Sequence, residues 1–402
     1  MAEYIDTDFN HRDLWLTRLY YLILLGGGGF IFPFINLFYV RQGLTGTQVG
    51  LVVALNSLSA LIAAPLWTEW SSKSSNPRAV LSLGLITSGL SFIWLSYQQT
   101  LIMIAIVSII RGLTHAGLFP LSDAMALKVT GATRSGFGSV RVFGSGGWAV
   151  IVLLGGYLIE KQGVSAAFSS AAFTYVASAL LLTLIHFPRH VQLNRPVANQ
   201  GGLHAVTVAI RKTPALAGLV ITLVVVGLGN IGVVNFENVY LDELGASESL
   251  IGVASMLSAV VEVPGMFWAD RLVRKQGPDR ILVLGLLLTG ATRVLVIVFP
   301  GLPAILAQKA LGGIAFSFYT VALIQYISRY SPADCTGTIL AVMTVTLASL
   351  IGIVGAPLSG WLFDLIGAYW LYSIALLGYL IGCLSLKVAN ARQEALATQQ
   401  TA

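Results

Sequence analysis

The chain has 402 residues, of which 56% are hydrophobic and only 10% are charged. Soluble domains carry about 25% charged residues, so this composition excludes an ordinary soluble protein. The net charge is +6, but the 23 lysines and arginines lie in short stretches between apolar runs rather than along one stripe, which argues against nucleic-acid binding. Apolar segments of about 20 residues recur along the whole length, each long enough to cross a bilayer core. The sequence therefore predicts an all-α polytopic membrane protein.

Twelve membrane-spanning helices are expected from the apolar runs between polar breaks. Six fall in an N-terminal half, residues 1–187, and six in a C-terminal half, residues 215–402, with a polar cytoplasmic linker at 188–214. The expected spans cover roughly 19–40, 49–68, 79–97, 101–123, 139–159, 165–187, 215–241, 249–269, 281–299, 302–328, 338–359 and 368–387.

The distribution of basic residues indicates the orientation of the chain. When both termini are placed in the cytoplasm, 18 of the 23 lysines and arginines lie on the cytoplasmic side, Arg41 and Lys161 lie outside, and three lie within spans. Basic residues concentrate in cytoplasmic loops. We therefore expect an integral protein of the cell (inner) membrane whose two termini are cytoplasmic.

The two halves are internal repeats of each other. Residues 34–38 (FINLF) match 236–240 (FENVY) at an offset of 202, 67–69 (WTE) match 268–270 (WAD) at 201, and 156–163 (GYLIEKQG) match 360–367 (GWLFDLIG) at 204. Three matches at nearly one offset, in three different spans, indicate a duplicated scaffold. Two six-span halves related by an axis along the membrane normal are a known transporter plan.

These features resemble the major facilitator superfamily over essentially the whole chain. The loop after the eighth span, residues 265–280 (GMFWADRLVRKQGPDR), is similar to the cytoplasmic signature of that family. The loop after the second span resembles a reduced copy, with Glu69 as the acid, Trp70 in the arginine position and Arg78 at its end. The resemblance implies the twelve-helix fold of that superfamily, with a central transport site between two halves.

A second pattern narrows the resemblance to a subgroup. Residues 120–123 (PLSD), followed by 138–145 (GSVRVFGS), are similar to the sugar, nucleoside and phenylpropionate proton symporters. Members of that subgroup often carry a histidine in the tenth span, whereas the comparable run here, residues 308–313 (QKALGG), has glycine in its place. The histidine-based proton site of the subgroup therefore has no counterpart in this span.

Five charged residues lie inside expected spans. Each costs roughly 2.5–3.5 kcal/mol at the centre of a bilayer, so five unpaired charges would cost about 12–18 kcal/mol. That sum exceeds the stability of most domains, about 5–15 kcal/mol. These side chains, Arg111, Glu237, Glu262, Arg293 and Lys309, are therefore expected to face one another, water or a solute. The four in the C-terminal half correspond to neutral positions in the N-terminal half, which marks them as breaks in the repeat.

The depth of these charges in the membrane suggests two ion pairs. Glu237 and Lys309 both lie toward the outer side of their spans, and Glu262 and Arg293 both lie near the middle, about 9 Å apart in height at 1.5 Å per residue. The pairs are interpreted in two ways, as structural pairs that allow folding or as a proton-coupling site. Burial raises the pKa of a carboxyl and a nearby arginine lowers it, so a change of contact could load and release a proton. On the functional interpretation Glu262 is the favoured coupling group.

Polar residues of the N-terminal half are candidates for solute contact. Arg111, His115 and Ser122 share one face of a helix at positions i, i+4 and i+11. Arg111 could bind an anionic or hydroxyl-rich solute with His115 beside it, although His115 also suits helix packing. Asn36 and Asn56 are further candidates, for which hydrogen bonds between helices are the alternative interpretation.

Four charged residues at the cytoplasmic ends of spans suggest an inner gate. Glu69 and Asp270 end the second and eighth spans, and the N-termini of the fifth and eleventh spans offer positive dipole ends on the same side. With Arg78 and Arg280 nearby, the two acids are expected to hold the halves together when the protein is open outward. Capping of the local loops is the alternative.

Together these features predict a secondary transporter for a small polar or anionic solute of the sugar, nucleoside or aromatic-acid class. Proton symport by alternating access is the favoured mechanism, and a proton-driven efflux antiporter or a non-transporting membrane sensor or scaffold are the alternatives. No nucleophile–base set, phosphate-binding loop or metal-ligand spacing is present in the sequence. We therefore expect no enzyme activity, no cofactor, no metal and no nucleic acid, and a monomer whose partners are the solute, protons and the bilayer.

Overall fold

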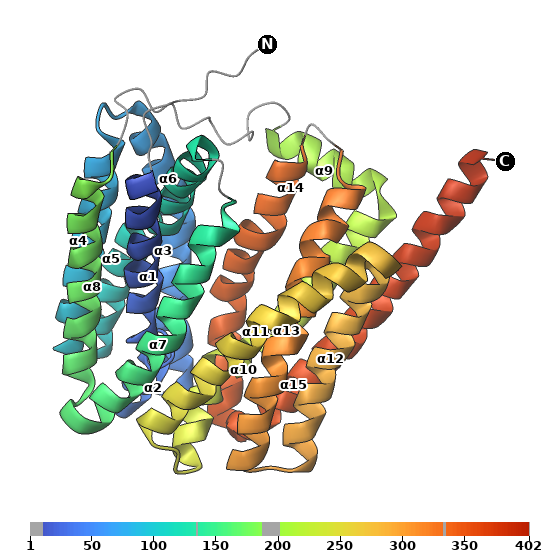
Figure 1. Cartoon of the computed structure of the whole chain (residues 1–402). Coiled ribbons are helices and arrows are strands. Elements are labelled where there is room, and N and C mark those ends of the chain that lie inside the picture. The colour runs from blue at the N-terminus through green and yellow to red at the C-terminus, as the bar shows by residue number, and fades with distance from the viewer. Residues whose placement is uncertain (1–10, 134–135, 187–201, 333–334, 402) are drawn as a thin grey trace. The chain divides into compact units, whose positions relative to one another are not determined.

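The computed structural model describes residues 11–133, 136–186, 202–332 and 335–401, which form helices joined by short connections, with no strand among them (Figure 1). This confirms the expected all-α class. The chain divides into two compact units. Of the described residues, unit 1 contains 11–44, 55–133, 136–186 and 247–256, and unit 2 contains 45–54, 202–246, 257–332 and 335–401. The first part of the expected linker, 188–201, lies outside the described residues, and its remainder contains a helix.

The helices begin and end as follows. The first eight are α1 (His11–Gly29), α2 (Ile35–Arg41), α3 (Gly46–Lys73), α4 (Pro77–Ser96), α5 (Leu101–His115), α6 (Leu118–Ala132), α7 (Gly138–Gln162) and α8 (Val164–Leu184). The remainder are α9 (Gly202–Lys212), α10 (Pro214–Glu243), α11 (Glu248–Gln276), α12 (Pro278–Val298), α13 (Leu302–Tyr330), α14 (Thr336–Ala341), the π-helical turn η1 (Val342–Thr346) and α15 (Leu347–Thr401).

Local sequence signals explain several of these ends. The side chain of Asn76 accepts a hydrogen bond from the backbone N–H of Ala79 at 3.2 Å, and Pro77 occupies the first turn of α4. Both features stabilise a helix start. The asparagine side chain accepts from a backbone N–H that has no partner within the helix, and proline has no N–H that would need such a partner. Gly277 separates α11 from α12 with φ of 84°, a conformation that favours glycine.

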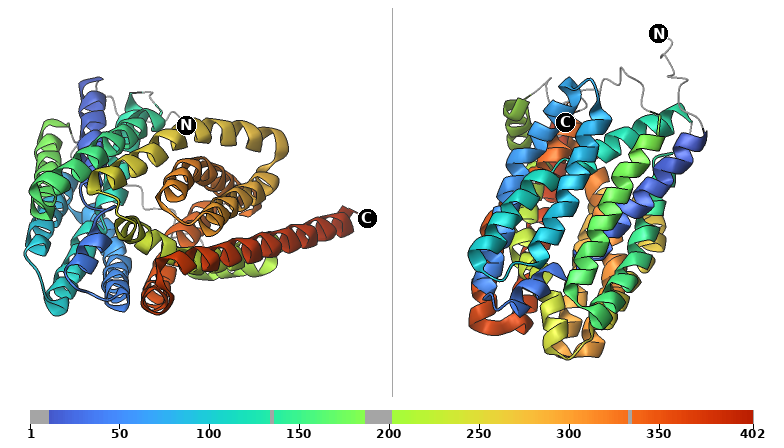
Figure 2. Two further views of the ribbon diagram at one scale, coloured as in Figure 1. Left: turned by 90° about the horizontal axis from the view of Figure 1, so that it is seen from below. Right: turned by 90° about the vertical axis from the view of Figure 1, so that its left-hand side faces the viewer.

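In unit 1, α1 packs against α7 and α8, and α4 packs against α8 and α5 (Figure 2). Glycines let α1 and α7 approach closely. A Cβ atom at Gly147 would lie 2.2 Å from the carbonyl oxygen of Leu22, and one at Gly29 would lie 2.8 Å from the backbone nitrogen of Val152. Small residues at helix contacts are the usual means of close packing inside a membrane.

Two acids of the repeated segment cap helix N-termini in the same way. In unit 2, the backbone N–H groups of Gly46 and Thr47 donate to Asp364 at 2.6 and 2.8 Å, and the Thr47 hydroxyl donates to it at 2.6 Å. In unit 1, the N–H of Ser249 donates to Glu160 at 3.3 Å. The matches at 156–163 and 360–367 therefore correspond to one local arrangement that occurs twice and satisfies free N–H groups at the starts of α3 and α11.

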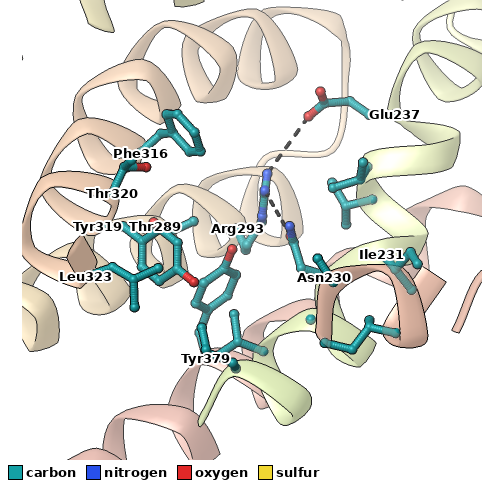
Figure 3. A pocket seen from close by; sticks show the side chains of 18 of the residues that line it. Asn230, Ile231, Glu237, Thr289, Arg293, Phe316, Tyr319, Thr320, Leu323 and Tyr379 are labelled. Atoms are coloured by element: carbon teal, nitrogen blue, oxygen red, sulfur yellow. Dashed lines mark hydrogen bonds and ion pairs between the residues drawn. The ribbon is translucent and has the colours of Figure 1, made fainter. Parts of the chain in front are cut away.

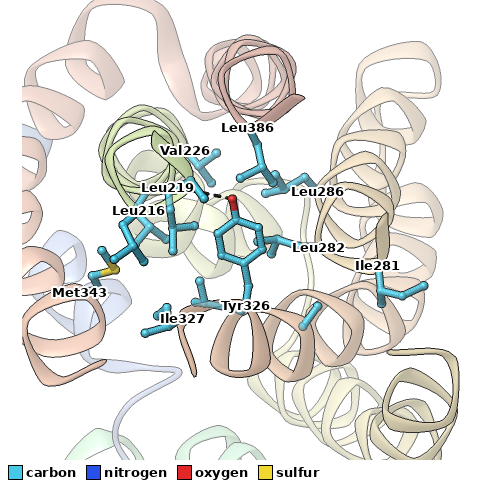
Figure 4. Packing of buried hydrophobic residues seen from close by; sticks show 14 of the residues in the cluster. Leu216, Leu219, Val226, Ile281, Leu282, Leu286, Tyr326, Ile327, Met343 and Leu386 are labelled. Carbon is cyan, nitrogen blue, oxygen red and sulfur yellow. Dashed lines mark hydrogen bonds between the residues drawn. The ribbon is translucent and has the colours of Figure 1, made fainter. Parts of the chain in front are cut away.

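The hydrophobic core of unit 2 is built mainly by α10, α12, α13 and α15 (Figure 4). Tyr326 is fully buried at its centre, and its hydroxyl donates to Asn390 at 2.6 Å and to the carbonyl of Ala215 at 3.3 Å. The ring therefore packs among leucines while its one polar atom stays hydrogen-bonded. Five members of this core also form part of the cavity wall of unit 2, namely Leu223, Val226, Leu323, Met343 and Tyr379.

Ten helices or helical runs in the described part of the chain are long and apolar enough to cross a membrane. The last of these runs, 336–396, contains two expected spans, which Gly367 separates with φ of 80°. The first expected span corresponds to α1 and α2, so the arrangement is consistent with twelve spans. Large side chains such as Phe173 and Phe267 are 74% and 72% exposed, as suits contact with lipid. The chain is an integral membrane protein.

Two expected spans are not continuous helices. The first begins at His11 rather than near residue 19, and it is interrupted between Gly29 and Ile35. Pro33 lies in the interruption, where its missing N–H and fixed ring oppose a helical hydrogen bond. The fourth span also divides, because α5 ends at His115 and α6 begins at Leu118. The two connecting residues, Ala116 and Gly117, keep helical backbone angles, so this break is a local interruption within one run of membrane length.

Candidate functional site

Unit 2 contains a cavity of ≈ 740 Å³ whose walls come from α10, α11, α12, α13, η1 and α15. Most of the wall is apolar, and among the described residues three charged side chains enter it, those of Glu237, Arg293 and Lys309. Figure 3 shows Arg293 between Glu237 and Asn230, with Tyr319 and Tyr379 on the opposite side. A largely apolar cavity with a few convergent polar groups has the form of a small-molecule site.

Glu237, on α10, carries the negative charge of the cavity. Its Oε2 lies 2.6 Å from Nζ of Lys309 on α13, and the two side chains are only 16% and 11% exposed. The expected contact between these two residues is therefore present. The hydroxyl of Tyr372 donates to Oε1 at 3.4 Å. Glu237 is thus held from two sides, as a buried carboxylate requires.

Arg293, on α12, is the second cation of the cavity and is 7% exposed. One of its terminal nitrogens donates to Oδ1 of Asn230 at 3.1 Å, and the other lies 3.8 Å from Oε1 of Glu237. The amide of Gln308 bridges the two charges when its nitrogen is assigned to the atom that faces Glu237. It then donates to Glu237 and accepts from Arg293, each at 2.6 Å. The carboxylate of Glu237 therefore forms ion pairs with two cations, Lys309 and Arg293.

Aromatic rings border this charged cluster. Tyr372 lies 5.7 Å from the guanidinium carbon of Arg293, a cation–π distance, and Phe316, Tyr319 and Tyr379 contribute to the cavity wall. The cavity therefore offers ring faces and phenol hydroxyls next to its charges. A solute with both a polar group and an organic body would match this combination.

Glu262 is placed differently from the expectation. It lies on α11 and is half-buried, and its backbone carbonyl accepts a hydrogen bond from the hydroxyl of Ser317 at 2.8 Å. Among the described residues, it is not part of the cavity wall, whereas Arg293 is paired with Glu237. Depth along a span gives only the height of a side chain, and the direction in which it leaves its helix selects its partner.

Arg111 and His115 lie together in unit 1, and no ion pair of either with an acid occurs among the described residues. The guanidinium of Arg111 lies 5.9 Å from the ring centre of Phe92, and the residue is only 8% exposed. Within the described residues, its Nε and the Nδ1 of His115 are buried without a hydrogen-bond partner. Ser122 does not join them, because its hydroxyl is hydrogen-bonded to that of Tyr20 at 2.7 Å.

The two asparagine candidates differ in their surroundings. Asn56, on α3, donates through Nδ2 to the backbone carbonyl of Ser108 on α5 at 3.0 Å, a hydrogen bond between helices. Asn36 lies half-buried on α2. Asn56 therefore has a structural role that accounts for its position.

The residues of the expected inner gate have local partners. Glu69 is paired with Lys73 on its own helix at 2.5 Å, and Asp270 with Arg274 at 2.5 Å. Asp270 also accepts from the side-chain amide of Gln325 at 3.2 Å. The other two gate residues are near the surface, with Arg78 donating to the carbonyls of Thr183 and Ile185 at 3.3 and 3.5 Å and Arg280 exposed. The gate between the halves stays a prediction.

Sequence reasoning gave no role to three residues that complete the cluster. Gln308 bridges the charges, and Tyr372 and Tyr379 add phenol groups to their surroundings. Gln308 could have been found from its place beside Lys309 in an apolar span, but the tyrosines are common in spans and carry no such signal. No group of three or more metal-ligating side chains occurs in the described part of the chain.

The chain is similar to known transporters over most of its length. The sequence model of the MFS_1 like family matches residues 14–374. The maltose permease of Geobacillus stearothermophilus is 25% identical over 358 residues, which cover 88% of this chain and 86% of that protein. The class H tetracycline resistance protein of Pasteurella multocida is 25% identical over 379 residues, covering 88% and 89%. The crystal structure of the nucleoside transporter NupG superimposes with a TM-score of 0.76 at 12% identity, covering 94% of this chain and 98% of that one, and this likeness concerns the fold.

Proposed function

The chain belongs to the major facilitator superfamily, and from that premise we propose that it moves a small polar or anionic solute together with a proton, using the cavity of unit 2. The observation that carries the proposal is the cluster in which Glu237 holds both Lys309 and Arg293. A buried carboxylate whose cationic neighbours can move apart from it is suited to bind a proton. We propose that the solute belongs to the sugars, nucleosides or aromatic acids.

The proposed coupling works through exchange of partners. When Glu237 is ionised, its negative charge offsets part of the positive charge of Lys309 and Arg293, and the three side chains stay paired. When Glu237 takes up a proton, both cations lose their acid and become available to a solute. Release of the solute and the proton on the other side restores the original pairing. In this family plan, the two halves rock about the site to expose it alternately.

We prefer symport over antiport because the protonated form of Glu237 is also the form in which both cations are available to the solute. The proton and the solute would then be bound at the same time. The relatives include both a permease and a resistance protein, so direction is a separate question. An antiporter would bind its solute when Glu237 is ionised and would release it on protonation. The two mechanisms therefore predict opposite effects of an imposed pH gradient on uptake into vesicles.

The test uses purified protein in proteoliposomes with an inward proton gradient and a panel of labelled maltose, uridine and 3-phenylpropanoate. We expect one member of the panel to accumulate, and Glu237→Gln to abolish this accumulation while exchange across the membrane continues. The matched control is Glu243→Gln, an exposed position on the same helix, which should transport like the wild type. Gradient-driven accumulation by Glu237→Gln would contradict the proposal.

Glu262 is the alternative coupling group, and the same assay separates the two. Its position outside the cavity wall supports Glu237 instead. We expect Glu262→Gln to retain accumulation. If Glu262→Gln were uncoupled and Glu237→Gln coupled, the proton site would lie on α11 rather than on α10.

A further inference from the structure

The charges of the unit 2 cavity bear on what kind of solute it takes. We propose that the solute is a small organic monocarboxylate whose carboxylate replaces that of Glu237 between Lys309 and Arg293 once Glu237 is protonated. This rests on the proposed proton coupling at Glu237. It goes beyond that coupling because it excludes neutral sugars and nucleosides as the coupled solute.

The balance of charge in the cavity is the first argument. Among the described residues of its wall, one carboxylate and two cations are the charged groups, which gives a net charge of +1. Protonation of Glu237 alone raises this charge to +2, and a neutral solute would leave it there during the crossing. A monoanion that binds with the proton restores +1. Because unpaired charge is costly within a membrane, the proton and the anion each favour binding of the other.

The geometry of the cations is the second argument. Both oxygens of Glu237 face donors, Oε2 toward Lys309 at 2.6 Å and Oε1 toward Arg293 at 3.8 Å. The Nε of Arg293 is buried and has no hydrogen-bond partner among the described residues. Arginine binds a carboxylate best through two parallel N–H groups. At 3.8 Å, Glu237 does not fill this fork, and a mobile carboxylate from a solute is free to approach it more closely.

The rest of the wall indicates the body of the solute. Phe316, Tyr319 and Tyr379 present rings to the same cavity, and Leu323 continues the apolar surface. The volume of ≈ 740 Å³ is within the range of small-molecule sites. Inorganic anions would leave these rings without a partner. An aromatic or aliphatic group attached to the carboxylate would bury against them.

The experiment measures binding to purified protein in detergent by titration calorimetry. The probes are benzoate, 3-phenylpropanoate and lactate, each compared with its neutral counterpart benzyl alcohol, 3-phenylpropan-1-ol or propane-1,2-diol, together with maltose. For the wild type, we expect a carboxylate to bind more tightly at lower pH, with uptake of about one proton for each anion in weakly buffered solution.

The variants give the decisive comparison. Glu237→Gln mimics the protonated acid, so it should bind the carboxylate about tenfold more tightly than the wild type at neutral pH and without pH dependence. Glu243→Gln should behave as the wild type. Lys309→Ala should bind the carboxylate about tenfold more weakly. Lys73→Ala, a matched lysine substitution at an exposed pair, should leave binding unchanged.

Two outcomes would overturn the inference. The first is that Glu237→Gln binds no carboxylate of the panel better than its neutral counterpart. The second is that maltose shows proton-driven uptake that Glu237→Gln abolishes, which would retain the proposed coupling and reject an anionic solute. Failure of the coupling itself would appear separately, as full proton-driven uptake by Glu237→Gln.

Discussion

The pair of Glu237 and Lys309 makes a quantitative prediction about stability. At an effective dielectric constant of about 20, a contact of 2.6 Å corresponds to a gross attraction of about 6 kcal/mol, and the 3.8 Å contact of Glu237 with Arg293 to about 4 kcal/mol. Desolvation cancels much of both. Removing one partner of a buried pair nevertheless costs about 3–5 kcal/mol, since a charge is left behind.

The single substitutions should differ in their cost. Lys309→Ala leaves Glu237 with Arg293 and Gln308, so we expect the free energy of unfolding to fall by about 3 kcal/mol, the lower end of that range. Glu237→Gln leaves two cations without an acid, and we expect a fall of about 5 kcal/mol. The double variant leaves only Arg293 unbalanced. It should be destabilised by at least about 2 kcal/mol less than the sum of the single variants.

The assay is reversible unfolding in mixed micelles, followed by tryptophan fluorescence for the four proteins of the cycle. The control cycle combines Glu69→Gln with Lys73→Ala, an exposed pair at the similar distance of 2.5 Å. We expect no measurable coupling there, because solvent screens exposed ion pairs. If the Glu237 and Lys309 substitutions were additive to within about 0.5 kcal/mol, the buried cluster would not act as a unit.

Three further predictions concern single sites. Asp364→Ala removes the acceptor of three hydrogen bonds at the start of α3. Thermal melts should show that the protein is destabilised by about 1 kcal/mol. An unchanged melting temperature would show that water replaces the cap. Gly147→Ala should sharply reduce the yield of monodisperse protein in size-exclusion chromatography, because the added Cβ would lie 2.2 Å from the carbonyl oxygen of Leu22. Gly146→Ala is the control and should be tolerated, because a Cβ there would have nothing within 4 Å. Equal yields of the two variants would contradict the close packing of α1 on α7. Arg111→Ala should reduce uptake of the solute without lowering the melting temperature. The buried guanidinium of Arg111 has no acid partner in the described structure, so its removal breaks no ion pair there. A marked drop in the melting temperature would assign Arg111 a structural role.

The sequence by itself determined the class of the protein. Apolar runs of membrane length and a charge content of 10% exclude a soluble fold, and the resemblance to the superfamily is confirmed by the match of the family model over residues 14–374. Helix interruptions were harder to foresee. Pro33 and Gly367 are visible in the sequence, but apolar composition varies too little along a span to show where a helix stops.

The sequence also determined that charges such as Glu237, Lys309 and Arg293 need partners, because the cost of burying a charge depends on residue type and depth alone. It located the contact of Glu237 with Lys309 from their similar depth. Only the tertiary structure decided that Arg293 pairs with Glu237 and that Gln308 bridges the charges. That choice depends on how each helix is rotated about its own axis, which packing against its neighbours determines and which no local property of a span records.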